Sequence, residues 1–293
     1  MVFFAQEHFC FSVFFYEKAF LNVFGSVFLL LTVVCFFGRL HRIMNTIVEV
    51  PIARPPWTGI GKRLESQVRK ALFDFQMLDG VAKLGVALSG GKDSLALLFM
   101  LKAISGRGVP PFELYALHVG GAFSCGAGIT TGYLQRVCDQ LEVPLIVRES
   151  TQKLETLECY SCSRERRRLL FDAAKSVGVE TIAFGHHRDD SVQTLLMNLL
   201  HKAEFAANLP KVPMVHFGVT IIRPLIYVPE KEIVAFAEHY GFKRIMCRCP
   251  VGQNSMRRQV SKLLEEMELL FPNARENIAQ AGLMYGSDKA LSP

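Results

Sequence analysis

The stretch Lys83-Leu84-Gly85-Val86-Ala87-Leu88-Ser89-Gly90-Gly91-Lys92-Asp93-Ser94 joins a short apolar run to a glycine pair. The run from Lys83 to Leu88 predicts a buried strand, and the helical spacing of apolar residues from Leu95 to Leu101 predicts a helix directly after the glycines. Residues 112–119 predict a second strand. The order strand, glycine turn, helix, strand is a βαβ unit, so we expect an α/β fold with a parallel sheet.

The same alternation continues toward the carboxyl end of the chain. Helices are predicted near residues 62–78, 129–141, 162–177, 190–201, 229–240 and 256–270, strands near 144–148 and 180–185, and an antiparallel pair of strands within 212–223. Because these strands are too apolar to face water, we expect a sheet flanked by helices on both faces, with ligands at the carboxyl ends of the strands.

The composition indicates a globular domain in a reducing compartment. With 293 residues, half of them hydrophobic, the chain is long enough for an ordinary α/β core without disulfides. The net charge of +6 permits a polyanionic partner without requiring one. Four of the eight cysteines fall in two tight clusters that suit a metal or cluster site, and we interpret the others as buried small hydrophobes: Cys10, Cys35, Cys125 and Cys138. We therefore expect a cytoplasmic protein.

The first 43 residues have a different character from the rest. Residues 19–37 carry no charge and are long enough to cross a bilayer. Arg39 and Arg42 follow them, so a membrane anchor would leave the catalytic domain in the cytoplasm. The alternative is that translation begins at Met44 and that this hydrophobic N-terminal segment is a start-site artefact. In either case we place residues 1–43 outside the catalytic unit.

Prolines mark the boundary before the catalytic domain. Pro51, Pro55 and Pro56 remove backbone donors and fix φ, which predicts a linker over residues 44–57. The catalytic domain is expected over residues 58–285, followed by a tail of residues 286–293.

The glycine pair has the chemistry of a phosphate site. Paired glycines let the backbone turn tightly and present amide hydrogens to an anion, and the helix N-terminus adds its positive dipole end. The spacing is not that of a Walker A loop, because Lys92 precedes an aspartate that is suited to hold Mg²⁺ against phosphates. The predicted ATP ligands are Ser89, Gly90, Gly91, Lys92, Asp93 and Ser94. These six residues resemble the PP-loop of the ATP pyrophosphatase superfamily, which implies cleavage of ATP between its α- and β-phosphates.

Two cysteine clusters supply thiolate ligands. Cys159 and Cys162 have the spacing that lets both reach one metal, at a predicted helix N-terminus that favours thiolate. Cys247 and Cys249 form a second cluster far downstream. Ligand chemistry alone leaves both zinc and an iron–sulfur cluster open.

A third motif, Gly185-His186-His187-Arg188-Asp189-Asp190, follows a predicted strand and begins a helix. It concentrates titratable groups where an α/β sheet keeps its active site, although a charged helix cap is an equally good interpretation. We assign His186 to nucleotide binding and Asp189 to magnesium or proton handling. Arg166 is a further catalytic candidate, because it lies one helical turn after Cys162.

Taken together, these motifs are similar to those of the TtcA family, the tRNA 2-thiocytidine synthetases. The resemblance spans residues 58–280 and includes the loop, Cys159-x-x-Cys162, residues 185–190, residues 222–225, Cys249 and Arg258-Gln259. It implies an adenine nucleotide α-hydrolase-like fold and a [4Fe-4S] cluster held by three cysteines. By position these are Cys159, Cys162 and Cys249, the last chosen over Cys247 because it lies before the polar stretch that leads to Arg-Gln.

The resemblance also implies a reaction and partners. ATP and Mg²⁺ on the loop would adenylate the C2 carbonyl of an anticodon-loop cytidine, and sulfur carried on the cluster would replace the oxygen. The expected partners are tRNA, a sulfur donor such as a cysteine desulfurase, a second copy in a homodimer, and a membrane only if residues 1–43 are translated. Basic residues expected to border the tRNA are Arg164, Arg166, Arg167, Arg168, Lys202, Lys211, Arg257 and Arg258.

Two alternatives and one departure accompany this interpretation. The alternatives are another PP-loop tRNA-modifying enzyme, of the 2-thiouridine or lysidine synthetase type, and a non-catalytic metal- and nucleotide-binding tRNA-binding protein. The departure is the sequence His118-Val119-Gly120-Gly121 after the second strand, where relatives carry an aspartate near the nucleotide.

Overall fold

The computed structural model describes residues 50–121, 131–152, 159–242 and 256–287. The chain divides into two compact units, Met1–Glu49 and Val50–Pro293, and all of the described residues belong to the second. Our expectations for residues 1–43 therefore lie outside the described residues. Within the described part, no helix combines the length and the hydropathy that crossing a membrane requires.

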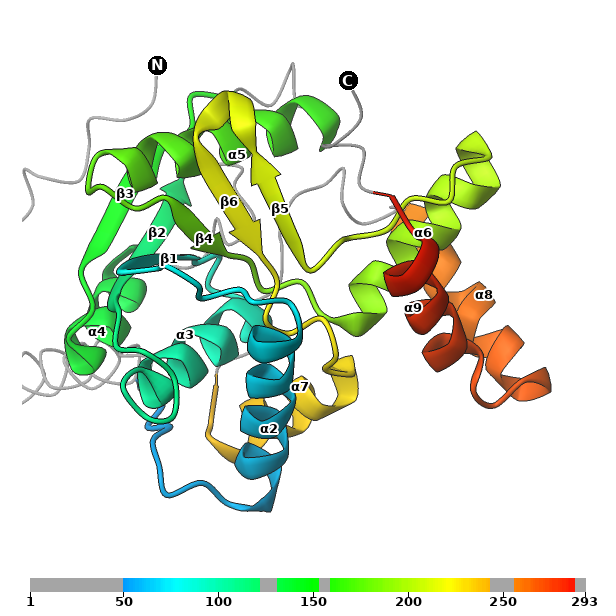
Figure 1. The fold of residues 1–293 in the computed structure, drawn as a ribbon, viewed down its shortest axis with the longest axis horizontal. Helices are drawn as coiled ribbons and strands as arrows, with labels where there is room; N and C mark the ends of the chain where they lie inside the picture. Colours follow the sequence, from blue (N-terminus) through cyan, green and yellow to red (C-terminus); the bar gives the residue numbers. More distant parts are fainter. Residues whose placement is uncertain (1–49, 122–130, 153–158, 243–255, 288–293) are drawn as a thin grey trace, which may run out of the picture. The chain divides into compact units, whose positions relative to one another are not determined.

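A six-stranded sheet forms the centre of this unit, in the order β3-β2-β1-β4-β6-β5 (Figure 1). All neighbouring strands are parallel except β5, which is antiparallel to β6. The strands are β1 (Lys83–Ala87), β2 (Glu113–Gly120), β3 (Leu145–Glu149), β4 (Thr181–Ala183), β5 (Lys211–Met214) and β6 (Val219–Ile222), with a short 3₁₀ turn, η2 (Val215–Phe217), between the last two. The predicted sheet and its antiparallel pair are confirmed. Strand order reverses between β1 and β4, where an open α/β sheet places its ligand crevice.

Helices cover both faces of the sheet, and a separate group extends beyond its edge (Figure 1). One face carries α2 (Gly59–Asp74), α3 (Lys92–Ile104), α4 (Thr131–Leu141) and α7 (Glu230–His239). The opposite face carries α5 (Cys159–Lys175). The group at the edge consists of α6 (Arg188–Lys202), α8 (Met256–Leu270) and α9 (Ala274–Tyr285).

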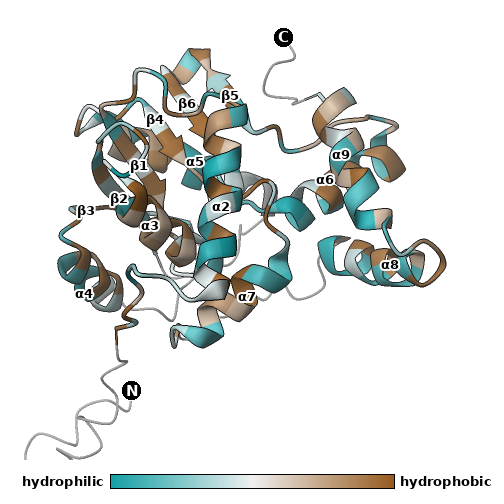
Figure 2. Cartoon of the chain, turned by 60° about the horizontal axis from the view of Figure 1, so that its bottom comes forward, coloured by the Kyte–Doolittle hydropathy of each residue, from teal (hydrophilic) through white to brown (hydrophobic). Residues whose placement is uncertain are grey.

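The core follows from where apolar side chains fall along these elements. Helix α3 is hydrophobic along most of its length (Figure 2), because it is enclosed between the sheet and neighbouring helices, with Phe99 and Met100 fully buried. On the other face Phe171 of α5 packs against Leu117 and Ile182 of the sheet. Burial of this kind stabilises the fold by about 1.5–3 kcal/mol per large apolar side chain. It fixes β1 and α3, and with them the loop that joins them.

Two parts of the fold differ from our expectations. Residues 50–57 are not only a linker, since Ala53 and Trp57 belong to the core and the Trp57 ring meets Phe236 and Tyr240 edge-on at 5.7 Å. The single tryptophan thus anchors the segment to α7. Helix α9, which follows α8 after a short turn and packs against α6, was not predicted.

Candidate active site at the carboxyl ends of β1 and β4

The glycine loop between β1 and α3 is held in shape by its own serines. Gly90 adopts φ +84°, a left-handed conformation that favours glycine. Ser89 Oγ accepts a hydrogen bond from the amide of Gly91 at 3.2 Å, and Ser94 Oγ donates to the carbonyl oxygen of Gly91 at 3.1 Å. Helix α3 then begins at Lys92, so its free amides face the crevice. The loop is built to receive an anion.

Lys92 lies between two carboxylates. Its Nζ atom is 3.0 Å from Asp93 Oδ1 and 2.9 Å from Oε1 of Glu230, the first residue of α7. Burial opposes the charge of the ammonium group, but attraction to Asp93 and Glu230 outweighs it and raises the pKa of Lys92. The lysine therefore stays a cation at the place where the loop would meet phosphate.

Gly185, at the end of β4, lets the second motif approach the loop. A Cβ atom on Gly185 would lie 3.0 Å from the amide nitrogen of Ser94 and 3.2 Å from the carbonyl carbon of Asp93. These neighbours are backbone atoms at the start of α3, which cannot move aside as a flexible side chain can. Glycine is required here for close contact between two backbones.

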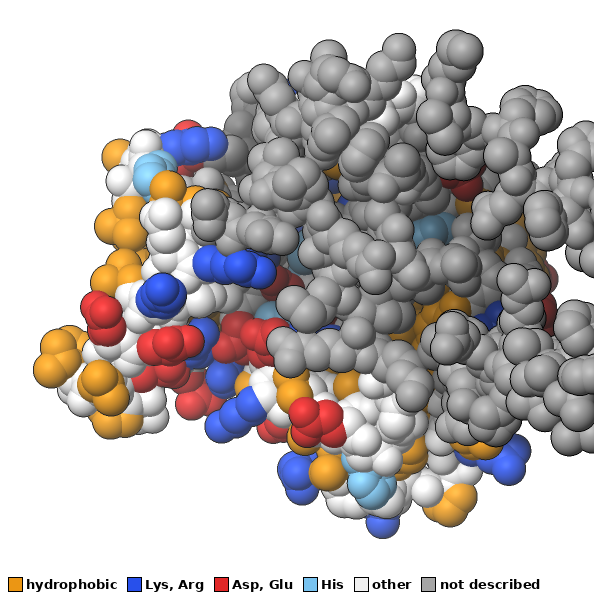
Figure 3. All heavy atoms as spheres, turned by 180° about the vertical axis from the view of Figure 1, so that it is seen from behind, with side chains coloured by type: hydrophobic (Ala, Val, Ile, Leu, Met, Phe, Trp, Pro, Cys, Tyr) orange, Lys and Arg blue, Asp and Glu red, His pale blue; other side chains and the backbone are white. Residues whose placement is uncertain are grey.

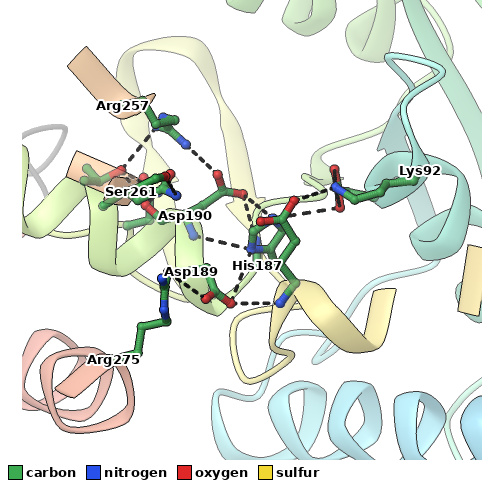
Figure 4. Close-up of polar contacts among 12 residues, drawn as sticks. Lys92, His187, Asp189, Asp190, Arg257, Ser261 and Arg275 are labelled. Atoms are coloured by element: carbon green, nitrogen blue, oxygen red, sulfur yellow. Dashed lines mark hydrogen bonds and ion pairs between the residues drawn. The ribbon is translucent and has the colours of Figure 1, made fainter. Parts of the chain in front are cut away.

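His187 and Asp190 connect the second motif to the loop. They form a reciprocal cap at the start of α6, in which the His187 amide donates to Asp190 Oδ2 at 3.2 Å and the Asp190 amide donates to His187 Nδ1 at 3.4 Å. With Nδ1 accepting, the neutral ring carries its proton on Nε2, which lies 3.8 Å from Asp93 Oδ1. Arg257 of α8 forms an ion pair with the other oxygen of Asp190 (Figure 4). A polar chain thus runs from α8 to the loop.

The contacts of Asp190 lead to a prediction about the stability of the protein in acid. Burial opposes ionisation of Asp190, but His187, His186 and Arg257 outweigh it and hold the pKa of Asp190 below its ordinary value of 3.8. A lowered folded-state pKa contributes stability that is present above pH 3.8 and is lost as pH falls below it. We expect Asp190→Asn to reduce the free energy of unfolding at pH 7 by about 2 kcal/mol. The variant should also lose less stability than the wild type between pH 5 and pH 3, both measured by denaturant titration. Equal losses in this range would contradict the assignment.

Asp189 points away from the loop toward α9 (Figure 4). Its Oδ2 accepts from the amide of Glu230 at 2.8 Å and its Oδ1 accepts from Nη1 of Arg275 at 3.2 Å, and its side chain is only 8% exposed. The carboxylate therefore joins α6 to α7 and α9, whereas Asp190 contacts His187, whose Nε2 atom lies 3.8 Å from Asp93 Oδ1. The magnesium or proton-handling role of Asp189 stays a prediction.

His186 is a partly buried histidine at the start of the second motif. Its ring stacks on Phe184, with centroids 5.7 Å apart and planes 3° apart, and among the described residues its buried Nδ1 atom has no hydrogen-bond partner. Burial, helped by the positive charge of Arg223, holds the pKa of His186 far below its ordinary value, so the ring is neutral. The structure brings His187, not His186, toward the loop, and the nucleotide-binding role of His186 stays a prediction.

The carboxyl end of β2 still carries a carboxylate, contributed by the next strand. A Cβ atom on Gly120 would lie 2.7 Å from Oε2 of Glu149, so this β3 side chain fills the space that Gly120 leaves open. Beside it, His118 Nδ1 is 2.8 Å from the carbonyl oxygen of Leu88. Burial lowers the pKa of His118 and the nearby Arg166 adds to this effect. Arg166 therefore lies close enough to His118 to influence it, and the catalytic role of Arg166 stays a prediction.

The proposed cluster ligands are only partly described. Cys162 is partly exposed in the first turn of α5, and Cys159 begins that helix, although its side chain is not described. A spacing of three residues places both on the same side of the helix. Cys247 and Cys249 lie outside the described residues. Within the described part of the chain, no three histidine, cysteine or acidic side chains are grouped closely enough to hold a metal.

The basic residues expected to contact tRNA have varied surroundings. Lys211 donates to the carbonyl oxygen of Gln76, Arg168 pairs with Asp172 at 3.2 Å, and Arg257 is held by the acidic motif. Acidic and basic side chains are interspersed over the edge formed by α6, α8 and α9, on the left of Figure 3. A uniformly basic surface is therefore not formed at that edge.

Three residues of this site were not predicted to contact its motifs, although Arg257 was predicted to border the tRNA. Glu230, Arg257 and Arg275 approach the loop and the second motif from α7, α8 and α9, and Glu230 lies 138 residues from its partner Lys92. Each is an ordinary charged residue on a helix. Only the fold brings them to the site.

Comparison with known proteins agrees with this geometry. Residues 62–246 match the family model described as "PP-loop domain". The chain is 38% identical over 234 residues to "tRNA-cytidine(32) 2-sulfurtransferase" of Xanthomonas euvesicatoria pv. vesicatoria (strain 85-10), covering 76% of this chain and 75% of that protein. It is 37% identical over 231 residues to the enzyme of the same name from Xylella fastidiosa (strain M12), covering 76% of each. The chain belongs to the family of tRNA-cytidine(32) 2-sulfurtransferases, which are PP-loop proteins.

A solved structure supports the fold of this PP-loop family member. The U34-tRNA thiolase NcsA from Methanococcus maripaludis, described with its [4Fe-4S] cluster, matches with a TM-score of 0.64 at 23% identity, covering 79% of this chain and 82% of that one. At this level of identity the match bears on architecture alone. The predicted resemblance to the TtcA family and the predicted fold class are confirmed.

Proposed function

We propose that this protein is an ATP-dependent tRNA sulfurtransferase that converts an anticodon-loop cytidine to 2-thiocytidine. The observation that carries the proposal is that the phosphate loop and the Cys159–Cys162 pair both lie at the carboxyl edge of one sheet, since β1 ends in the loop and α5 begins after β3. Family membership, with relatives that are 37–38% identical tRNA-cytidine(32) 2-sulfurtransferases, supports the same substrate.

The loop residues perform the activation step. The cytidine O2 atom attacks the α-phosphate of ATP, the bond to the β-phosphate breaks, and pyrophosphate leaves. Lys92 and the amides at the start of α3 offset the charge that develops on the phosphates. His187 and Asp190 hold the second motif against the loop and so fix its geometry. A sulfur nucleophile then bonds to C2, and AMP leaves with the former O2 atom.

The residues present fit both inorganic groups that this chemistry implies. Asp93 and Glu230 offer hard carboxylate oxygens, the ligands that Mg²⁺ prefers, beside Lys92. The i, i+3 spacing of Cys159 and Cys162 in the sequence suits two ligands of a [4Fe-4S] cluster, with Cys249 as the proposed third. The cluster would supply the sulfur atom. A zinc site made from all four cysteines is the competing metal assignment.

The remaining proposals concern the domain bounds, the cellular location and the partners of the enzyme. We place the catalytic domain over residues 58–285, extended at its N-terminal side by the packed segment that contains Trp57. We assign the protein to the cytoplasm, with a sulfur donor such as a cysteine desulfurase and a second copy of the chain as further partners. These assignments rest on the proposed chemistry.

The test combines a metal assay with tRNA analysis. Protein purified without oxygen should contain iron and sulfide, and 2-thiocytidine should disappear from the tRNA of a deletion strain, measured by mass spectrometry of nucleosides. Cys162→Ala should fail to restore 2-thiocytidine. The matched control is Cys138→Ala, because Cys138 is buried in the core of the sheet, where burial raises the pKa of its thiol to about 12.

Three outcomes would contradict the proposal. Zinc without iron would exclude the cluster. Unchanged 2-thiocytidine in the deletion strain would exclude the substrate, and loss of 2-thiouridine or lysidine instead would identify one of the alternative enzymes. Equal failure of the Cys162 and Cys138 variants would show that the loss reflects folding and not a ligand.

A further inference from the structure

Lys92 is fully engaged without any nucleotide. Its ammonium group contacts both oxygens of Asp93, at 3.0 and 3.2 Å, and Oε1 of Glu230 at 2.9 Å. An ammonium group has three donors, and three carboxylate oxygens lie within hydrogen-bond distance of it. A phosphate oxygen that binds Lys92 must therefore replace at least one of these contacts.

Of these contacts, the one to Glu230 is the more easily exchanged. Asp93 belongs to the loop itself, whereas Glu230 reaches across from α7 and its side chain is 46% exposed. Only its backbone is fixed, because the Glu230 amide donates to the buried Asp189 at 2.8 Å. The end of the Glu230 side chain can thus move away from Lys92 while its Cα stays beside the loop.

The two carboxylates beside Lys92 disfavour binding of a polyphosphate that carries no metal ion. One lysine faces two carboxylates, so the local charge is negative before ATP arrives, and a Glu230 that is displaced by phosphate still lies within a few ångströms of it. Like charges at such distances repel unless a cation lies between them. A divalent ion on the phosphates would turn the repulsion into attraction, since carboxylate oxygens are ligands for Mg²⁺.

We infer that Glu230 makes the loop selective for magnesium-bound nucleotide: its carboxylate competes with phosphate oxygens for Lys92 and repels ATP that arrives without a metal. The inference rests on the proposed function only in that ATP binds at residues 89–94. It assigns to a residue of α7 a part in metal selectivity, in addition to that of Asp93.

The experiment compares ATP affinity with and without magnesium. Isothermal titration of the full-length protein with ATP, in EDTA and in excess MgCl₂, gives two dissociation constants for each variant. Glu230→Gln keeps the size of the side chain and removes its charge. We expect it to bind ATP in EDTA roughly tenfold more tightly than the wild type, so that the ratio of the EDTA to the magnesium dissociation constant falls by a similar factor. Inorganic pyrophosphate in EDTA should show the same gain.

The matched control is Glu232→Gln. Glu232 lies in the same first turn of α7, so its loss has the same effect on the helix dipole, but its side chain accepts from Nε2 of Gln67 on α2 at 3.2 Å. This variant should bind ATP in EDTA as the wild type does. A gain in affinity cannot come from misfolding, which makes the sign of the change informative.

The outcomes separate this inference from the proposed function. Unchanged or weaker binding of Glu230→Gln in EDTA, or an equal gain in Glu232→Gln, would overturn the inference alone. Wild-type protein that binds no ATP in either buffer would overturn both. Normal metal-dependent binding in a protein that does not thiolate tRNA would uphold the inference and overturn the proposed function.

Discussion

Replacing Lys92 with methionine is expected to reduce ATP-dependent adenylation of tRNA by two to three orders of magnitude, roughly the effect of removing one stabilising charge from a transition state. Methionine keeps the length of the side chain but removes the only cation that the described loop presents to the phosphates. It also leaves Asp93 and Glu230 without their shared partner, which adds repulsion against ATP. Pyrophosphate release in single-turnover reactions with tRNA measures the effect directly.

The control for this variant is Lys62→Met. Lys62 is exposed on α2 and its side chain has no recorded contact among the described residues, so the same chemical change there should leave pyrophosphate release unchanged. If Lys92→Met retained more than a tenth of the wild-type rate, the loop would not be the activating site.

A methyl group on Gly185 is expected to have the second largest effect, a loss of about a hundredfold in the same reaction. The new Cβ atom would meet the amide nitrogen of Ser94 at 3.0 Å, and the backbone at the start of α3 would have to shift by a few tenths of an ångström. Small displacements of positioning groups cost rates of this order. Single-turnover pyrophosphate release, together with the ATP dissociation constant, measures the displacement.

Gly59→Ala provides the comparison. Gly59 begins α2, and an added Cβ atom there would approach nothing closer than the Arg63 side chain at 3.8 Å. This variant should retain wild-type rates. Full activity of Gly185→Ala would mean that the β4–α6 turn can separate from the loop without consequence, contrary to the close packing described.

Local patterns predicted most of the fold because the forces behind them are local. The apolar runs of β1 and β2 and the spacing in α3 reflect burial of neighbouring residues, and the glycine pair reflects one backbone turn. Helix α9 was not predicted because Gly282, a residue that is unfavourable inside a helix, interrupts its apolar side. That glycine is explained only by tertiary contacts, since a Cβ atom there would lie 3.3 Å from Leu195 and 3.4 Å from Ala207.

The site was predictable in part for the same reason. The loop and the motif at residues 185–190 are each contiguous, so the sequence displays them whole. The sequence could not show what Asp189 and Asp190 contact, because adjacent residues at a helix start differ in direction by about 100°. Only the fold shows that Asp189 accepts from the Glu230 amide and that Asp190 lies beside His187. Glu230 was missed, and the contact of Arg257 with Asp190 was not predicted, because their partners lie on other elements, 138 and 67 residues away.

Two arginines pair with the successive aspartates of the second motif, and these ion pairs couple the helices at the edge of the molecule to the active site. Arg257 ties α8 to Asp190, and Arg275 ties α9 to Asp189, so both helices are attached to the turn that touches the loop. Thermodynamic linkage between two binding sites is reciprocal. If a ligand bound at the turn also stabilises the position of the helices, a macromolecule that binds the helices changes the affinity for that ligand by the same factor. Through these two ion pairs, the positions of α8 and α9 are coupled to the turn beside the phosphate loop.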